Sequence, residues 1–232
     1  DTHTPYDFST QKEKMMVSVG RIGTPPKNNE LLLYAISKIE NLGEYRFYFI
    51  GPVLDNFKAK VEKLIMDRPD LKNKIILTGN ITDKEELYSY YKRAEIFAFT
   101  SLHESFGLVL VEALYFGCYL LSTDLSGTYD VTNGGEFGSI VEVNEKMILE
   151  LFEEYKVLNN KKAMQEYIDN NFDKILSSKW FEDSTNKLAS ELENIIAGKI
   201  NTKELGYSSA ENIYKNFNWN TIVDRLDRLY EK

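Results

Sequence analysis

Two glutamates, Glu104 and Glu112, stand in the otherwise largely apolar stretch FTSLHESFGLVLVEALYFGCYLLSTD. A carboxylate in an apolar helix is costly unless something pairs with it, so these residues mark a candidate site. If the helix begins near Ser105, eight residues of helical rise separate the two carboxylates by roughly 12 Å. Glycosidase carboxylates face each other across about 5 to 9.5 Å. The spacing therefore favours two groups that hold opposite ends of an extended ligand, such as one with a sugar ring at each end.

The residues between the two glutamates predict an anion site. Ser105, Phe106 and Gly107 would begin the helix, where the first backbone N–H groups have no helical acceptor. Such a helix N-terminus binds anions, and a diphosphate would fit it. The alternative interpretation is that Glu104 is a solvated capping residue and that Glu112 is paired in the core. The residue types and their spacing leave both interpretations open.

Two cations, Arg21 and Lys27, lie in the loop GRIGTPPKN, directly after an apolar segment. They are candidates for binding the same anion, and the alternative is that they are ordinary surface cations. The segment from Gly20 to Gly23 is not a G-x-G-x-x-G fingerprint, so it is weak evidence for a dinucleotide site. His103 would orient a ligand, or it is a structural or solvated loop histidine.

The elements that must position these residues follow a strand–helix alternation. Short apolar runs predict strands, and the segments between them have helical spacing of apolar residues. This order predicts an α/β fold with a parallel sheet flanked by helices. Ligands of such sheets bind beyond the carboxyl ends of the strands, which is where all the candidate residues fall. The predicted strands are Met15–Val19, Arg46–Ile50, Lys74–Leu77, Glu95–Phe99, Tyr119–Ser122 and a short one at Ser139–Val143.

The rest of the chain predicts a lead-in and a helical C-terminal segment. Residues 1–14 are polar and weakly patterned, and we interpret them as a linker. Residues 15–144 form the core, and residues 145–232 form a charged helical segment that completes the domain. Within the core, the stretch from Asp124 to Gly138 is rich in turn residues. Ser126, Gly127 and Thr128 there predict either a loop that closes over a ligand or a plain turn.

Composition excludes several classes of protein. A net charge of −8 and a pI near 5.0 argue against broad nucleic-acid binding. One cysteine, Cys118, and two histidines make a Cys- or His-based metal site unexpected, so no metal is predicted. No apolar run approaches the ~20 residues of a membrane span, and no signal peptide is evident. The expected location is therefore the cytoplasm.

The motifs together resemble a known family. VGRIGTPPKN, followed by FTSLHESFGLVLVEALYFGCYLLSTDLSGTYDV, is similar to the C-terminal donor-binding domain of the group 1 family of retaining glycosyltransferases with the GT-B fold. Glu104 and Glu112 match the family's Glu-x7-Glu signature, and Arg21 and Lys27 match its GR…K signature. The closing FNWNTIVDRLDRLYEK resembles its terminal helices. The resemblance implies a Rossmann-like half of a GT-B fold with a helical C-terminal extension.

The resemblance also implies roles for the candidate residues. Glu104 would contact the donor sugar and Glu112 the ribose of a nucleotide sugar. Arg21 and Lys27 would stabilise the diphosphate leaving group without a metal. The remaining donor-binding candidates are Gly20, His103, Phe106, Gly107 and Leu108.

The chain departs from the family pattern at several positions. Lys27-Asn28 stands where the family often has Lys-Gly, and the spacing from Arg21 to Lys27 is one residue longer than is common. Gly117-Cys118-Tyr119 stands where Gly-x-Pro is usual, and Asp130 replaces a usual glutamate. The stretch from about 156 to 203 is longer and more helical than the family norm. These departures leave the identity of the donor open.

The resemblance implies one half of an enzyme. Fewer than 20 residues precede the first predicted strand, so the N-terminal acceptor domain of a GT-B enzyme is expected to be missing and the chain to be inactive by itself. A glycan or lipid-linked acceptor would bind through that domain, with peripheral membrane contact in the full-length protein left open. The alternatives are a non-catalytic binding or interaction module with the same fold, and a nicotinamide-dependent oxidoreductase, against which the missing glycine fingerprint speaks.

Overall fold

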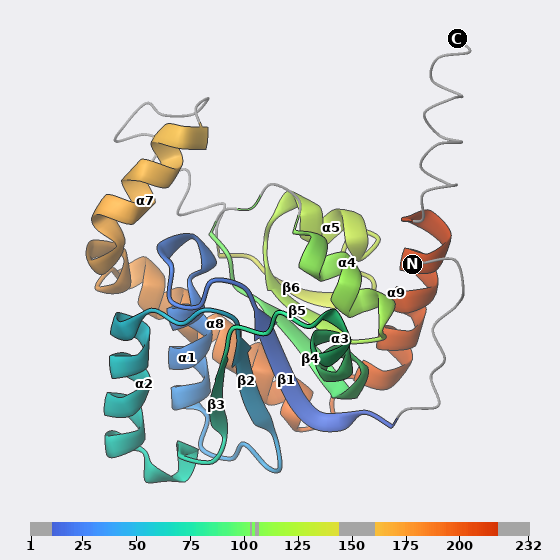
Figure 1. Cartoon of the computed structure of the whole chain (residues 1–232), viewed down its shortest axis with the longest axis horizontal. Coiled ribbons are helices and arrows are strands. Elements are labelled where there is room, and N and C mark those ends of the chain that lie inside the picture. The colour runs from blue at the N-terminus through green and yellow to red at the C-terminus, as the bar shows by residue number, and fades with distance from the viewer. Residues whose placement is uncertain (1–10, 103, 105–106, 144–160, 218–232) are drawn as a thin grey trace.

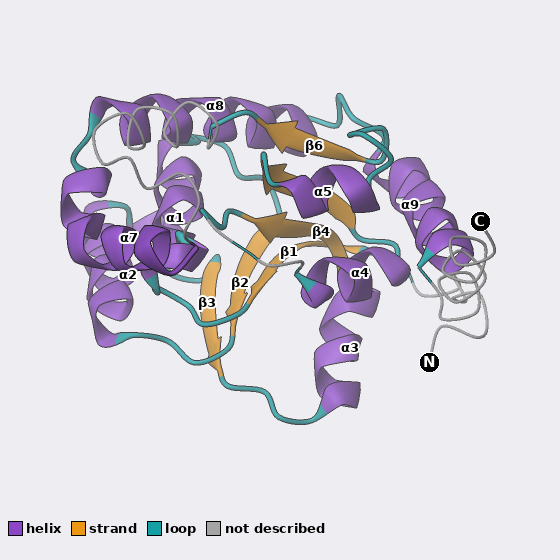
Figure 2. Ribbon diagram, turned by 90° about the horizontal axis from the view of Figure 1, so that it is seen from above, coloured by secondary structure: helices purple, strands orange, loops and turns teal. Residues whose placement is uncertain are grey.

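The computed structural model describes residues 11–102, 104, 107–143 and 161–217. A six-stranded sheet forms its centre, with helices on both faces (Figures 1 and 2). The strands are β1 (Glu13–Val19), β2 (Arg46–Ile50), β3 (Ile75–Gly79), β4 (Ala94–Phe99), β5 (Tyr119–Thr123) and β6 (Gly138–Val141). The α-helices are α1 (Asn29–Lys38), α2 (Asp55–Asp67), α3 (Lys84–Arg93), α4 (Leu108–Tyr115), α5 (Ser126–Val131), α7 (Lys161–Leu176), α8 (Lys179–Ile196) and α9 (Thr202–Asn216). Two short 3-10 helices are η1 (Pro25–Lys27) and η2 (Pro69–Leu71).

The sheet has the order β3-β2-β1-β4-β5-β6, and every neighbouring pair is parallel. The predicted parallel α/β fold is therefore confirmed. The chain builds outward from β1 in one direction and then returns to place β4 on the other side of β1. This reversal is the topological switch point, where doubly wound sheets bind ligands beyond the carboxyl ends of the strands. The loops after β1 and β4 are the ones that carry the candidate residues.

Side chains alternate between two hydrophobic cores, as the two-residue period of a strand requires. Met16 of β1 joins the core beneath α1, α2 and α8, whereas its neighbours Met15 and Val17 join the core beneath α3, α4 and α9. Figure 2 shows these two groups of helices on opposite faces of the sheet. The strand β4 is buried along its whole length, which explains why it is apolar except for Glu95, whose buried carboxylate accepts hydrogen bonds from Tyr45 and Thr202.

Some local predictions need correction. The turn-rich segment after Asp124 contains the short helix α5, and the Thr128 hydroxyl donates to the Leu125 carbonyl at 2.6 Å inside it. That segment is therefore neither a ligand-closing loop nor a plain turn. The helix α4 begins at Leu108 rather than near Ser105. The strand β1 begins at Glu13, two residues before the predicted start.

The described part of the C-terminal segment is helical, as predicted. In α8, Leu188, Leu192 and Ile195 are buried against the sheet's first core. The apolar stripes predicted at 148–158 and 222–230 lie outside the described residues.

Candidate functional site

The ion pair between Lys27 and Glu104 is the centre of the candidate site. The Lys27 Nζ donates to the Glu104 carboxylate across 77 residues of sequence, because β1 and β4 are neighbours and their following loops meet. The two side chains are 18% and 24% exposed, so a ligand at this edge can reach both. The same Nζ lies 5.4 Å from the centroid of the Phe99 ring, at the end of β4. Lys27 is therefore held in place by a carboxylate and an aromatic face.

The loop after β1 has a conformation that presents Lys27 to this edge. Two prolines begin the 3-10 turn η1, and the Lys27 amide donates to the Thr24 carbonyl at 2.9 Å. Gly20 has a φ of +154°, and a Cβ there would lie 3.4 Å from the Cε of Lys27. Glycine therefore suits both the backbone and the room that the lysine stem needs. Arg21 follows it in the same loop and is exposed.

Backbone hydrogen bonds join the two loops. The Leu102 amide donates to the Pro26 carbonyl at 2.8 Å, and the Thr100 hydroxyl donates to the Asn28 carbonyl at 3.0 Å. These two bonds flank Lys27 on one loop and precede Glu104 on the other. The hydrogen bonds between the two loops therefore help to set the distance between Lys27 and Glu104, in addition to the ion pair itself.

The N-terminus of α4 lies beside Glu104. Gly107 is its N-cap with a φ of +78°, and a Cβ there would lie 3.3 Å from both the Cγ of Glu104 and the Cζ of Phe99. Glycine at this position therefore allows the close packing between the helix start and the ion pair. The predicted anion-binding N–H groups shift accordingly toward Gly107 and Leu108, whose side chain is 71% exposed.

Glu112 lies further along α4 and has different electrostatic neighbours. Burial raises the pKa of its carboxyl group, while Lys84 and the Tyr91 hydroxyl of α3 oppose that rise. This hydroxyl is buried and makes no hydrogen bond of standard geometry within the described chain, although it lies in electrostatic reach of the carboxylate. The structure thus places Glu112 partly in the apolar core.

The structure brings Gly20, Lys27, Glu104 and Gly107 together. The predicted residues His103 and Phe106 lie outside the described residues. The sequence prediction missed Asn28, which is fully buried and whose side-chain amide has no hydrogen-bond partner in the described structure. Its φ of +44° is left-handed, a conformation that glycine and asparagine adopt most readily. The replacement of the family's frequent glycine by asparagine was therefore a signal of this backbone geometry.

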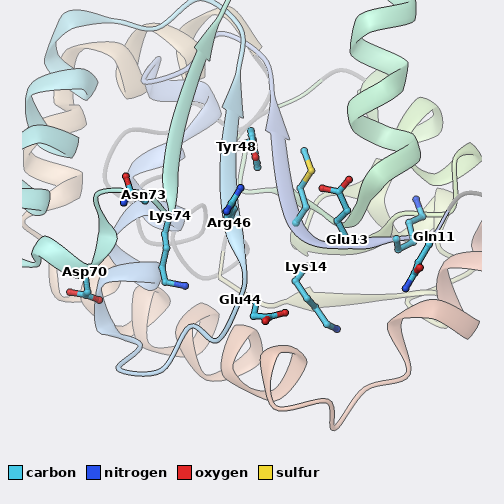
Figure 3. A pocket seen from close by; sticks show the side chains of 11 residues that line it. Gln11, Glu13, Lys14, Glu44, Arg46, Tyr48, Asp70, Asn73 and Lys74 are labelled. Carbon is cyan, nitrogen blue, oxygen red and sulfur yellow. The ribbon is translucent and has the colours of Figure 1, made fainter.

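A groove of about 980 Å³ lies at the opposite, amino edge of the sheet (Figure 3). Lysines and carboxylates line it together, and several are already paired within the fold. Lys14 binds Glu95 at 2.9 Å, and Asp70 binds Arg68 at 2.7 Å. Because charges of both signs line this groove and some of them are already paired, it is a weaker candidate for binding an anionic ligand than the edge that carries Lys27.

Among the described residues, no three His, Cys, Asp or Glu side chains gather in a way that would hold a metal ion. In the same part of the chain, no helix is both long and apolar enough to cross a bilayer.

Comparisons with known proteins agree with the fold and with the motifs. The family model described as "Glycosyl transferases group 1" matches residues 6–174. The chain therefore belongs to the group 1 glycosyltransferase family.

Two curated relatives come from Campylobacter jejuni. N-acetylgalactosamine-N,N'-diacetylbacillosaminyl-diphospho-undecaprenol 4-alpha-N-acetylgalactosaminyltransferase is 32% identical over 136 residues, which are 58% of this chain and 35% of the relative. GalNAc-alpha-(1->4)-GalNAc-alpha-(1->3)-diNAcBac-PP-undecaprenol alpha-1,4-N-acetyl-D-galactosaminyltransferase is 27% identical over 170 residues, which are 71% of this chain and 44% of the relative. The match thus spans less than half the length of either relative.

Solved structures show the same fold. TarM superimposes with a TM-score of 0.64 at 19% identity, over 100% of this chain and 38% of TarM. Sucrose-phosphate synthase from Thermosynechococcus elongatus superimposes with a TM-score of 0.62 at 20% identity, over 97% of this chain and 46% of that chain. At these identities, the comparison supports the Rossmann-like fold of a GT-B half.

Proposed function

We propose that this chain is the nucleotide-sugar-binding domain of a retaining, metal-independent glycosyltransferase. The observation that carries the proposal is the Lys27–Glu104 pair at the switch point of the sheet, beside the N-terminus of α4. A cation, a carboxylate and free helix-terminal N–H groups at one edge match a ligand with a diphosphate and a sugar hydroxyl side by side.

Each residue has a defined role in this proposal. When the bond between the anomeric carbon and the diphosphate oxygen breaks, its electron pair stays on the diphosphate. Lys27 and Arg21 stabilise the negative charge that develops there, together with the N–H groups at Gly107 and Leu108. Glu104 accepts hydrogen bonds from hydroxyls of the donor sugar. Glu112 accepts hydrogen bonds from the ribose hydroxyls.

The relatives support this choice of substrate class. The C. jejuni relatives are named as N-acetylgalactosaminyltransferases, and both names contain an undecaprenol-linked diphosphate. The structure of a mutant of S. aureus TarM contains UDP and superimposes on this chain with a TM-score of 0.61. We infer that the donor is a nucleoside diphosphate sugar and that the acceptor is a glycan or a lipid-linked glycan. A cytoplasmic location with peripheral membrane contact fits such an acceptor.

The greater length of the relatives supports the proposal that a further domain contributes to activity. Since this chain matches 35% to 44% of their length, we propose that an N-terminal acceptor domain completes the active enzyme. The chain by itself then binds the donor but transfers sugar poorly.

Titration calorimetry with UDP, GDP, ADP and their hexose derivatives tests the proposal. One nucleotide series is expected to bind, and Glu112→Ala is expected to weaken binding of the nucleoside diphosphate. The absence of binding to every compound would overturn the proposal. Binding by the chain, with no sugar transfer after the N-terminal domain is added, would support a non-catalytic module with the same fold. Preference for a nicotinamide cofactor in the same titration would support an oxidoreductase.

A further inference from the structure

The helix α7 lies next to the loops that carry Lys27 and Glu104. Figures 1 and 2 show it beyond the carboxyl edge of the sheet, close to the loop after β1. The sequence motifs assign no role to this helix, although the family match extends into it, to residue 174. Its position relative to the site therefore needs an explanation of its own.

The contact between α7 and the site is a small hydrophobic cluster. Ile168, Phe172 and Ile175 of α7 are buried together with Leu102, and Leu176 and Trp180 pack against them. Leu102 is 1% exposed although it lies in a loop. Because α7 also contacts η1, the helix lies against both loops.

Leu102 transmits this packing to the ion pair. It lies two residues before Glu104, and its amide donates to the carbonyl of Pro26, the residue before Lys27. If the Leu102 side chain were not held by α7, the loop would lose the contact that keeps this bond aligned. This bond and the bond from Thr100 to Asn28 join the two loops, so both help to set the spacing between the lysine and the glutamate.

A second contact joins the same helix to Lys60 of α2 and, through an ion pair of Lys60, to the start of α1. The Lys60 Nζ lies 5.8 Å from the centroid of the Phe172 ring and 2.8 Å from a carboxylate oxygen of Glu30. Glu30 is 1% exposed and lies in the first turn of α1, directly beyond the loop that carries Lys27. Phe172 thus lies against Leu102 in the loop after β4, and against Lys60, whose ammonium group pairs with Glu30 just beyond the loop that carries Lys27.

We propose that α7 is a positioning element of the donor site, and that Phe172 is its principal positioning residue. Through Leu102 and the Glu30–Lys60 pair, Phe172 holds the loop after β1 against the loop after β4, so that Lys27 and Glu104 stay at a fixed separation. The positioning role of α7 does not depend on the proposed function. Only its consequence, that this separation governs binding of a nucleoside diphosphate, rests on the proposed function.

The first test is independent of any ligand. Amide hydrogen exchange is compared among the parent chain, Phe172→Ala and Phe172→Leu. We expect Phe172→Ala to speed exchange of the Leu102 amide at least tenfold relative to the sheet amide of Phe47, which donates to the Lys74 carbonyl at 2.7 Å. Phe172→Leu is expected to restore most of the protection. Unchanged exchange at Leu102 in a folded Phe172→Ala chain would overturn the proposal.

A matched control separates positioning from a general loss of stability. Phe181 is of the same residue type and is similarly buried, 5% against 8% for Phe172, but it packs against Tyr34 of α1 with ring centroids 5.9 Å apart. Phe181→Ala is expected to lower the melting temperature without a selective change at Leu102. If Phe172→Ala does not fold, Ile168→Val makes a smaller change on the same face and is expected to show the same selectivity. Equal effects of the control and the test variants would refute the positioning role.

The second test measures binding of the nucleoside diphosphate selected by the parent chain. Phe172→Ala is expected to weaken binding about tenfold, Phe172→Leu to recover it, and Phe181→Ala to leave it unchanged at a temperature where all are folded. If the parent binds no nucleoside diphosphate, the proposed function fails, and the exchange result by itself decides the positioning role. Parent-like binding by Phe172→Ala, together with faster Leu102 exchange, would refute the claim that this spacing governs binding.

Discussion

Replacing the two members of the Lys27–Glu104 pair separately should have opposite effects on nucleoside diphosphate binding. Lys27→Met removes the ammonium group, whose Nζ lies 5.4 Å from the Phe99 ring centroid, and keeps an unbranched apolar side chain. A hydrogen bond to a charged group contributes about 1.5 to 3 kcal/mol, so the dissociation constant should rise roughly 10- to 150-fold. Glu104→Gln keeps the shape of the side chain but removes the negative charge that neutralises the lysine.

The expected gain from Glu104→Gln is smaller than the loss from Lys27→Met. The two side chains are 18% and 24% exposed, so solvent screens the pair and its net contribution is about 1 kcal/mol. A diphosphate must compete with the glutamate for the lysine, and removing this competition should lower the dissociation constant by up to about fivefold. Sugar transfer by the complete enzyme should nevertheless fall, because Glu104 no longer binds the donor sugar as a carboxylate.

Calorimetry at low and at high salt provides the measurement. Lys92→Met is the matched control, because the Lys92 Nζ also lies over an aromatic ring, 5.7 Å from the Phe116 centroid, but at the end of α3 that leads to the amino edge. It should leave binding unchanged. If Glu104→Gln weakened nucleoside diphosphate binding as strongly as Lys27→Met does, the reasoning about competition would be refuted. If Lys27→Met bound the nucleoside diphosphate as tightly as the parent chain does, Lys27 would not belong to the binding site.

Three further predictions concern stability. Gly51→Ala should destabilise the fold by about 3 kcal/mol or more, because its Cβ would lie 1.9 Å from a carbonyl oxygen of the neighbouring loop. The control Gly43→Ala, whose Cβ would have nothing within 4 Å, should cost only about 1 to 2 kcal/mol. Urea denaturation measures both losses, and equal losses would contradict the steric argument. Glu112→Gln should raise the melting temperature at pH 7, because burial raises the pKa of the native carboxyl group and its ionised form therefore costs stability. This gain in melting temperature should disappear as the pH falls below 4.5, the ordinary pKa of a glutamate carboxyl group. A gain that does not change with pH would disprove this cause. Lys60→Met should lower the free energy of unfolding by about 3 kcal/mol, because it leaves the buried carboxylate of Glu30 without its cation. Adding Glu30→Gln should recover most of that loss. A double variant as unstable as the single variant would show that packing, and not charge, is responsible.

Much of the fold could be predicted because it depends on local patterns. Apolar runs closed by glycine, as at Val19-Gly20 and Ile50-Gly51, predict buried strands that end at one edge. The alternation with amphipathic segments requires parallel crossovers, since parallel neighbours need a long connection. The loops after the strands therefore had to gather at one edge, which is why Arg21 and Lys27 could be proposed to bind the same anion as the helix that follows Glu104.

Local patterns predicted the structure of a segment less well where that structure depends on residues distant in the sequence. The turn-like composition around Thr128 concealed the helix α5, whose buried threonine bonds back to Leu125 and to Thr123. The buried carboxylate of Glu95 is held by Tyr45 and Thr202, which are 50 and 107 residues away in the sequence. No period or spacing indicates such partners, because the partners come from separate elements.

The sequence by itself determined the residue types of the site and the edge of the sheet at which they lie, because strand periodicity and chain direction are local properties. Only the tertiary structure decided that β4 lies beside β1 and that Lys27 therefore meets Glu104. It likewise decided that Phe172 packs behind Leu102. Strand order and helix docking are set by the burial of large apolar surfaces between distant segments, and that burial is a property of the whole folded chain.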